Sequence, residues 1–219
     1  MNPRLPITKP RLRGVSHQYA FMSALTLAPL MIVITPGVAS RFVISIYVFA
    51  IVGLFGVSAL YHRGDWGERG RAIMKRLDHS MIFVAIAATY TPIAVFALDG
   101  GTARWILPTV WIGAALGIVA NLIWHHAPYP VIAAPYVALG WVGVVALPAV
   151  LDGLGVAGFT LIVVGGVLFS IGAVFYALHR PNPWPTWFGY HEIFHLFVIA
   201  GVAVHYVAVA FFAVPQATA

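Results

Sequence analysis

The sequence contains no cysteine and few charged residues. Asp, Glu, Lys and Arg together make up 8% of the 219 residues, and only six residues are acidic. The absence of cysteine excludes disulfide bonds and thiolate metal sites, and it leaves the redox compartment of the protein undetermined. Any metal ion would therefore have to be held by histidine and carboxylate ligands.

Hydrophobic residues, in contrast, make up 61% of the chain, and its mean hydropathy is +0.92. A soluble domain of this length cannot bury so much apolar surface, so the composition predicts an integral membrane protein in contact with the lipid bilayer. The formal net charge is +6. In a membrane protein the placement of Lys and Arg is more informative than their sum, and we expect no nucleic-acid partner.

Seven apolar stretches follow a basic leader at residues 1–14, and each is close to the ~20 residues that a helix needs to cross the hydrocarbon core. Turn-forming sequences rich in Gly, Pro and Asp separate them. We therefore expect an all-α integral membrane protein with one seven-transmembrane helix bundle at residues 15–214 and a short tail at 215–219. The expected spans are about 16–35, 41–62, 77–98, 104–124, 130–150, 156–178 and 190–213.

The distribution of basic residues predicts how these spans are oriented. If the N-terminus is cytoplasmic, the leader and the inside loops hold all of the twelve Lys and Arg residues except Arg41 and Arg104. The positive-inside rule then places the N-terminus in the cytoplasm and the C-terminus outside. We expect a multi-pass protein of the cell inner (plasma) membrane.

The stretch His191-Glu192-Ile193-Phe194-His195 opens the last apolar segment. Its spacing puts His191 and His195 on one helix face, where both could bind a single metal ion. His62 is the candidate third ligand, because it ends the second span at the same predicted membrane depth. Histidines also gather at membrane interfaces, but a pair four residues apart within an apolar helix usually marks function. His205 lies too deep for this site, and we expect it to make a structural hydrogen bond between helices.

Two further polar residues converge on this depth. Ser58 lies one turn before His62, and Asp78 opens the third span. Three neutral imidazoles and a water molecule form a tetrahedral Zn²⁺ site of the catalytic type, in which bound water has a pKa of about 7. Asp78 could take the proton or orient the water, and Ser58 could hydrogen-bond to the water or to a developing oxyanion. Alternatively, Asp78 could pair with a neighbouring cation or cap its own helix.

At these residues the chain resembles the hemolysin III family, the bacterial branch of the progestin and adipoQ receptor (PAQR) superfamily. The resemblance covers essentially the whole chain. The matching sequences are Ser58-Ala-Leu-Tyr-His62, Leu77-Asp78-His79-Ser80 running on to Thr89-Tyr90-Thr91-Pro92, and Pro183-Trp184-Pro185 followed by Phe188-Gly189-Tyr190-His191-Glu192-Ile193-Phe194-His195.

The resemblance implies a seven-helix fold with a cytoplasmic N-terminus and a zinc ion near the cytoplasmic face. It places the family's zinc histidines on His62, His191 and His195, its aspartate on Asp78 and its serine on Ser58. The superfamily includes alkaline ceramidases, which implies hydrolysis of a lipid amide. The family name implies haemolysis and pore formation, and relatives are also linked to membrane-lipid homeostasis.

The leading hypothesis is a zinc-dependent hydrolase that acts on an amide or ester bond of a membrane lipid. An alternative is a non-enzymatic pore-forming, cytolytic or receptor-like protein in which the zinc ion is structural. A lesser alternative is an intramembrane zinc protease, with Glu192 as the general base of an H-E-x-x-H motif. Glu192 is, however, rotated by about 100° from His191 on the helix. The Asp-Gly pairs that such a protease would need, at 99–100 and 152–153, are expected on the outer side. The sequence does not predict the oligomeric state.

Overall fold

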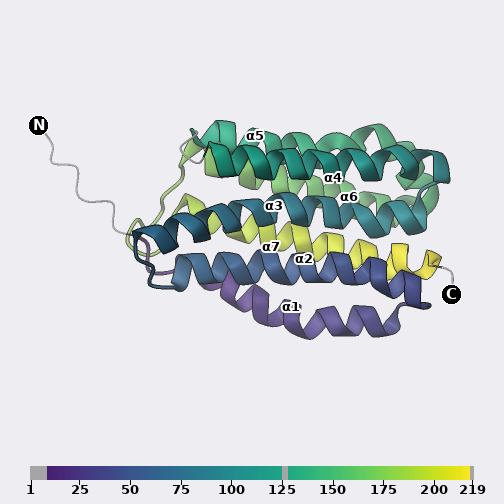
Figure 1. Ribbon diagram of the computed structural model, residues 1–219, viewed down its shortest axis with the longest axis horizontal. Coiled ribbons are helices and arrows are strands. Elements are labelled where there is room, and N and C mark those ends of the chain that lie inside the picture. The colour runs from purple at the N-terminus through teal and green to yellow at the C-terminus, as the bar shows by residue number, and fades with distance from the viewer. Residues whose placement is uncertain (1–8, 125–127, 218–219) are drawn as a thin grey trace, which may run out of the picture.

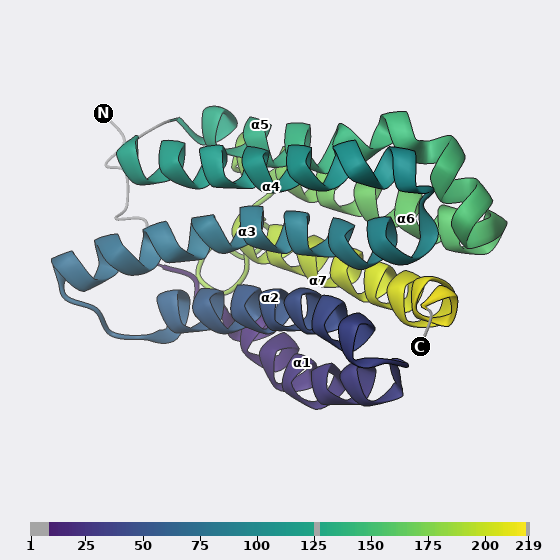
Figure 2. The same ribbon diagram turned by 45° about the vertical axis from the view of Figure 1, so that its right-hand side comes forward.

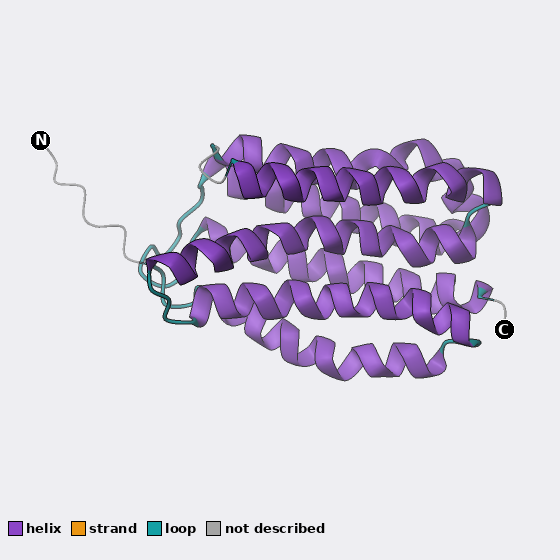
Figure 3. Cartoon of the chain, in the orientation of Figure 1, coloured by secondary structure: helices purple, strands orange, loops and turns teal. Residues whose placement is uncertain are grey.

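The computed structural model describes residues 9–124 and 128–217, and in these ranges it forms helices and connections without a strand. The first eight residues of the expected leader, which include Arg4, lie outside the described residues, as do residues 218–219 of the expected tail. The helices lie side by side in one elongated bundle (Figures 1 and 3). The all-α fold class expected from the sequence is confirmed.

Six helical segments in the described ranges are long and apolar enough to cross a membrane. One of them, Ala133–Leu178, has 46 residues and combines parts of three consecutive elements. In chain order the elements are α1 (Val15–Ile34), α2 (Val38–Arg63), α3 (Glu68–Ala97), α4 (Gly100–Ile123), α5 (Tyr129–Gly140), the 3-10 helix η1 (Trp141–Ala146), α6 (Leu147–Leu178), α7 (Tyr190–Ala208), the π-helical turn η2 (Val209–Ala213) and η3 (Val214–Gln216).

The two ends of the bundle differ in charge. The end at which α1 begins also carries the α2–α3 and α6–α7 connections, and it lies at the left of Figure 1. We call this the basic end, because the basic residues at 9–13 and those of these connections gather there. The opposite end, where α1 turns into α2 and α3 into α4, is called the far end.

The connection between the expected fifth and sixth spans differs from the sequence-based expectation. Residues 151–155 are assigned to α6, and only Gly155 leaves the helical conformation, with φ 66° and ψ 176°. Glycine adopts a positive φ without a steric penalty, so the helix bends there. Gly153, which the sequence analysis placed in a loop, packs on α3 instead: a Cβ atom added to it would lie 1.8 Å from the Ala97 carbonyl oxygen.

Helix α3 is longer than the expected third span. It begins at Glu68, within the expected loop 63–76, and its first turns project beyond α2 and α4 at the basic end (Figure 2). Glu, Arg, Ala, Met and Lys are good helix formers, so this charged stretch continues the helix outside the apolar window. As a result, its basic side chains are held on a rigid helix.

A close contact between α6 and α7 positions His205. The Nε2 atom of His205 lies 3.0 Å from the Ile162 carbonyl oxygen, so the expected interhelical hydrogen bond is confirmed. The contact depends on Gly165, because a Cβ atom at this position would lie only 2.2 Å from the His205 ring. Small residues of this kind let membrane helices approach each other closely.

Candidate metal centre

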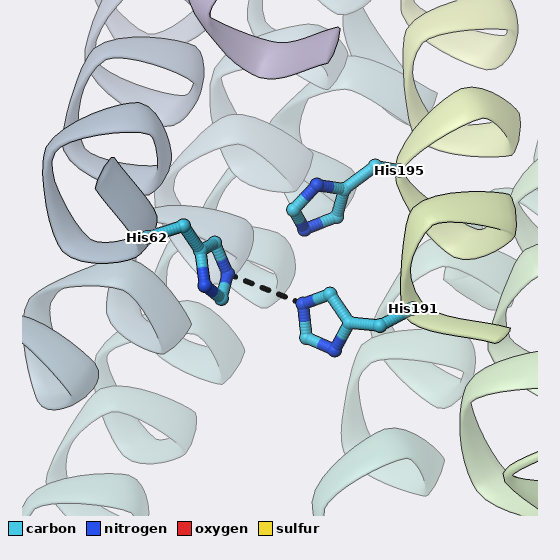
Figure 4. A group of neighbouring side chains, drawn as sticks. All are labelled: His62, His191 and His195. Carbon is cyan, nitrogen blue, oxygen red and sulfur yellow. Dashed lines mark hydrogen bonds between the residues drawn. The ribbon is translucent and has the colours of Figure 1, made fainter. Parts of the chain in front are cut away.

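Three histidines from two helices meet inside the basic end of the bundle. His62 lies in the last turn of α2, and His191 and His195 lie in the first two turns of α7. Figure 4 shows the three rings turned toward one another. The Nε2 atoms of His62 and His191 are 3.1 Å apart, and one ring nitrogen from each histidine lies within 4.8 Å of the other two.

The donor set of this cluster fits a divalent metal ion. Tetrahedral zinc with Zn–N bonds of about 2.0–2.1 Å separates its ligand nitrogens by roughly 3.3 Å. The His62–His191 pair is close to this spacing, whereas the overall limit of 4.8 Å is wider. His62 and His195 are 6% and 2% exposed, and His195 Nδ1 has no hydrogen-bond partner among the described residues. A buried imidazole nitrogen without a hydrogen-bond partner is readily explained by a cation bound within the cluster.

Asp78 and Ser58 adjoin the histidines, as the sequence analysis expected from their depth. Asp78 on α3 and Ser58 on α2 are both buried, and their side chains are neighbours. An Asp78 carboxylate oxygen lies 3.9 Å from His62 Nε2. Within the described ranges, Asp78 makes no ion pair with Lys or Arg. The carboxylate is therefore directed at the histidine cluster.

An elongated cavity of about 210 Å³ extends from this cluster into the bundle. Ser58, Asp78, His191 and His195 line its end at the cluster. Most of its remaining wall is apolar and comes from α2, α3, α5, η1, α6 and α7, as far as His205. The Asp78 carboxylate and two of the clustered histidines thus lie at one end of a space whose wall is mostly apolar and favours hydrocarbon.

Comparison with known proteins shows the family of the chain. The family profile described as Haemolysin-III related matches residues 5–206. The chain belongs to this family. It is 34% identical to Hemolysin-3 of Bacillus cereus over 142 residues, which are 65% of this chain and 62% of that protein. It is 33% identical to the Hemolysin-3 homolog of Bacillus subtilis (strain 168) over 147 residues, 67% of this chain and 66% of the relative. The matches thus span somewhat less than two thirds of these relatives.

A human protein is also similar. The Monocyte to macrophage differentiation factor of Homo sapiens is 26% identical over 168 residues, which cover 75% of this chain and 67% of the human one. Together with the apolar helices, membership of the haemolysin-III related family indicates a multi-pass membrane protein.

In this family member, His17 of α1 is a neighbour of the site that the sequence analysis did not select. Its ring stacks on His195 with the centroids 3.8 Å apart and the planes 10° apart. His17 is 3% exposed, and neither ring nitrogen has a hydrogen-bond partner among the described residues. Its position near the start of the first span was visible in the sequence, but the direction in which α1 faces was not. The stacking fixes one face of the His195 ring.

Residues 9–14 form a strap across the basic end. Arg13 forms an ion pair with Glu192, and the Lys9 ammonium donates a hydrogen bond to the His62 carbonyl oxygen. The strap also pairs with the α6–α7 connection, where the Arg11 and Leu12 amides donate to the carbonyl oxygens of residues 186 and 187 at 3.0 and 3.1 Å. The strap therefore contacts the backbone of one candidate ligand and the first turn of the helix that carries the other two.

Gly14 allows this close approach. Its φ is +81°, and a Cβ atom there would lie 2.5 Å from the His62 Cβ. Both carboxylate oxygens of Glu192, the residue after His191, have partners. One is paired with Arg13, and the other accepts a hydrogen bond of 2.8 Å from the Gly189 amide, so that the Glu192 side chain caps the start of α7. This carboxylate stabilises the entry to α7 and links it to α1.

Proposed function

We propose that this protein is a metal-dependent hydrolase that cleaves an amide or ester bond of a membrane lipid, with Zn²⁺ held by His62, His191 and His195. The observation that carries the proposal is that two of the three clustered histidines, His191 and His195, line one end of a mostly apolar cavity together with Asp78 and Ser58. A zinc ion bound by three imidazoles would supply a water molecule acidic enough to yield hydroxide near neutral pH.

The protein's own groups have complementary roles in this proposal. The Asp78 carboxylate accepts a proton at the site and passes it to the leaving group. The neighbouring Ser58 hydroxyl donates a hydrogen bond that keeps this carboxylate oriented. The apolar wall of the cavity binds the hydrocarbon chain of the lipid and excludes bulk water from the reacting bond.

The proposal includes a membrane placement. A stretch of 46 residues is about twice the ~20 that one crossing requires, so Ala133–Leu178 would cross twice and give seven spans in all. The excess of Lys and Arg at the basic end would place this end, and the metal centre, on the cytoplasmic side of the cell inner membrane, with the C-terminus outside.

A second candidate function follows from the names of the relatives. Two of them are called Hemolysin-3 or its homolog, which favours a cytolytic, pore-forming role in which a metal ion only ties helices together. The apolar wall of the cavity is poorly suited to a water-filled pore within one chain. The intramembrane protease has less support, because Glu192 is held by Arg13 and Asp99 caps α4 at the far end.

The experiment compares the purified protein with the His191→Ala/His195→Ala double variant. We expect about one zinc per chain by elemental mass spectrometry, its loss in the variant, and hydrolysis of a lipid amide or ester that requires both the metal and Asp78. Well-folded protein without stoichiometric metal would refute the proposal. Zinc-dependent dye release from vesicles, without any lipid hydrolysis, would favour the pore-forming alternative.

A further inference from the structure

A second cavity, of about 290 Å³, lies at the basic end between α2, α3 and α4. Its wall includes Arg71, Lys75 and Arg76 from the projecting part of α3, with Glu68 as the single carboxylate. The cations therefore outnumber the acids three to one. We call this cavity the basic pocket.

The side chains of the basic pocket are well placed to bind an anion. Arg76 Nε is buried and has no hydrogen-bond partner in the described part of the chain. Asn121 of α4, which also lines the pocket, holds the neighbouring backbone in place by donating to the Arg76 carbonyl oxygen at 3.1 Å and to Ser80 Oγ at 3.1 Å. Guanidinium and ammonium groups at one opening are the usual ligands of a phosphate group.

The electrostatic potential near the pocket is positive. Lys9 of the strap lies within electrostatic range of the guanidinium groups of Arg71, Arg13 and Arg63 and of one carboxylate, that of Asp65. Like charges this close repel one another, so an anion bound at Arg71 would relieve the repulsion.

The basic pocket adjoins the apolar cavity of the metal centre. His79 lines both. Along α3, the pocket residues Ala72 and Lys75 continue into His79 and the cavity residues Ile82 and Ile86 at spacings of three or four, so they share one helix face. Lys75 is only one turn, about 5 Å, from the level of Asp78. One amphiphilic molecule could therefore place a charged group in the pocket and a chain in the cavity.

We propose that the basic pocket binds the phosphate group of an anionic phospholipid whose acyl chain lies in the apolar cavity. The inference rests on the proposed function and names the substrate class: a lipid with a phosphate headgroup rather than a neutral one. In a glycerophospholipid only the glycerol unit separates the phosphate from the acyl esters, which matches the short distance from the pocket to Asp78. Basic pockets between helices near the cytoplasmic surface are suited to such headgroups.

The test measures lipid binding by native mass spectrometry of the full chain in mild detergent. Dioctanoylphosphatidylglycerol is compared with dioctanoylglycerol, which has the same chains and no phosphate. We expect the wild type to prefer the phospholipid by about tenfold or more, since several charge-assisted hydrogen bonds are involved. Arg71→Gln/Lys75→Gln/Arg76→Gln should lose this preference, and Arg76→Gln alone should reduce it if the triple variant does not fold.

The matched control removes the same charge elsewhere at the basic end. Arg11→Gln/Arg69→Gln/Arg180→Gln alters three exposed cations outside the pocket and should keep the preference. An equal loss in this control would overturn the inference, because general surface charge would then explain the binding. Competition by inorganic phosphate or glycerol 3-phosphate at the concentration at which the lipid binds would also overturn it, in favour of a soluble phosphate compound.

The same measurement separates this inference from the proposed function. Lipid preference does not require the metal, so it should persist in His191→Ala/His195→Ala, which should lose hydrolysis. Preference without hydrolysis in the wild type would refute the hydrolase and leave the lipid site standing. Hydrolysis of neutral and anionic lipids at equal rates, without preferential binding, would refute the lipid site alone.

Discussion

The ion pair between Arg13 and Glu192 offers a quantitative test of the strap. The Arg13 side chain is 17% exposed and that of Glu192 only 3%, so removal of the arginine leaves a carboxylate in a nearly dry site with the Gly189 amide as its remaining hydrogen-bond donor. Breaking a buried pair in this way typically costs 3–5 kcal/mol. Because Arg13 retains some contact with water, we expect about 2–3 kcal/mol for Arg13→Gln.

The measurement is the free energy of unfolding in mixed micelles, from an SDS titration followed by tryptophan fluorescence. Glu192→Gln removes the charge but keeps an oxygen that can accept from the amide. In this background Arg13→Gln should cost less than about 1 kcal/mol, because no buried charge remains unpaired. The coupling energy of the cycle should therefore be at least ~1 kcal/mol.

Arg11→Gln serves as the matched control. Arg11 belongs to the same strap, is exposed, and stacks its guanidinium over the Trp187 ring at 4.6 Å. An exposed contact of this kind is worth about 0.5–1 kcal/mol. If Arg13→Gln destabilises no more than Arg11→Gln does, the Arg13–Glu192 pair does not anchor the strap and the reasoning is wrong.

Three further outcomes are expected at the far end and within the bundle. Tyr90→Phe removes the hydroxyl that donates to the Gly140 carbonyl oxygen at the end of α5 and accepts from the Gly143 amide of η1. Thermal unfolding should show a loss of stability of about 1–3 kcal/mol. An unchanged unfolding transition would show that the junction of α5 and η1 does not depend on these hydrogen bonds. Gly165→Ala should cost roughly 1–3 kcal/mol by overpacking on His205, and a stability equal to wild type would disprove the tight contact. Hydrogen bonds at the start of α4 lower the pKa of Asp99 below its ordinary 3.8. The ionised Asp99 side chain therefore stabilises the folded protein fully above its unfolded-state pKa, and this stabilisation is lost as the pH falls through the lower folded-state pKa. The difference in free energy of unfolding between wild type and Asp99→Ala should thus be constant above about pH 5 and shrink below about pH 4. A difference that is undiminished at pH 3 would contradict this pH dependence.

The meeting of the three histidines could be predicted from the sequence, because it depends on helix periodicity and on the order of the spans. The four-residue spacing of His191 and His195 fixes their relative direction on any helix, and the alternation of spans brings His62 to the same depth. The stacking of His17 could not be predicted in this way. Hydropathy gives the depth of a residue, but the face that α1 turns toward α7 depends on packing between helices far apart in the chain.

The ends of two helices could not be predicted from hydropathy, because charged residues and glycines also occur within helices. The start of α3 was assigned to a loop because its cations ended the apolar window, although the same residues favour helix. Gly153 was read as a turn, whereas it is a contact residue and Gly155 is the bend. The pairing of Glu192 with Arg13 was missed for another reason: residues 179 positions apart meet only when the bundle closes.

This separation has a consequence for biosynthesis. At about 5–20 residues per second, a ribosome needs roughly ten to forty seconds to extend the chain from Arg13 to Glu192. Within this interval α1 and α2 emerge first, and until the last helix is made Arg13 lacks Glu192 and His62 lacks His191. The candidate metal centre therefore comes together only after α7 has been made, and a nascent chain stalled before α7 lacks both the Arg13–Glu192 ion pair and two of the three imidazoles.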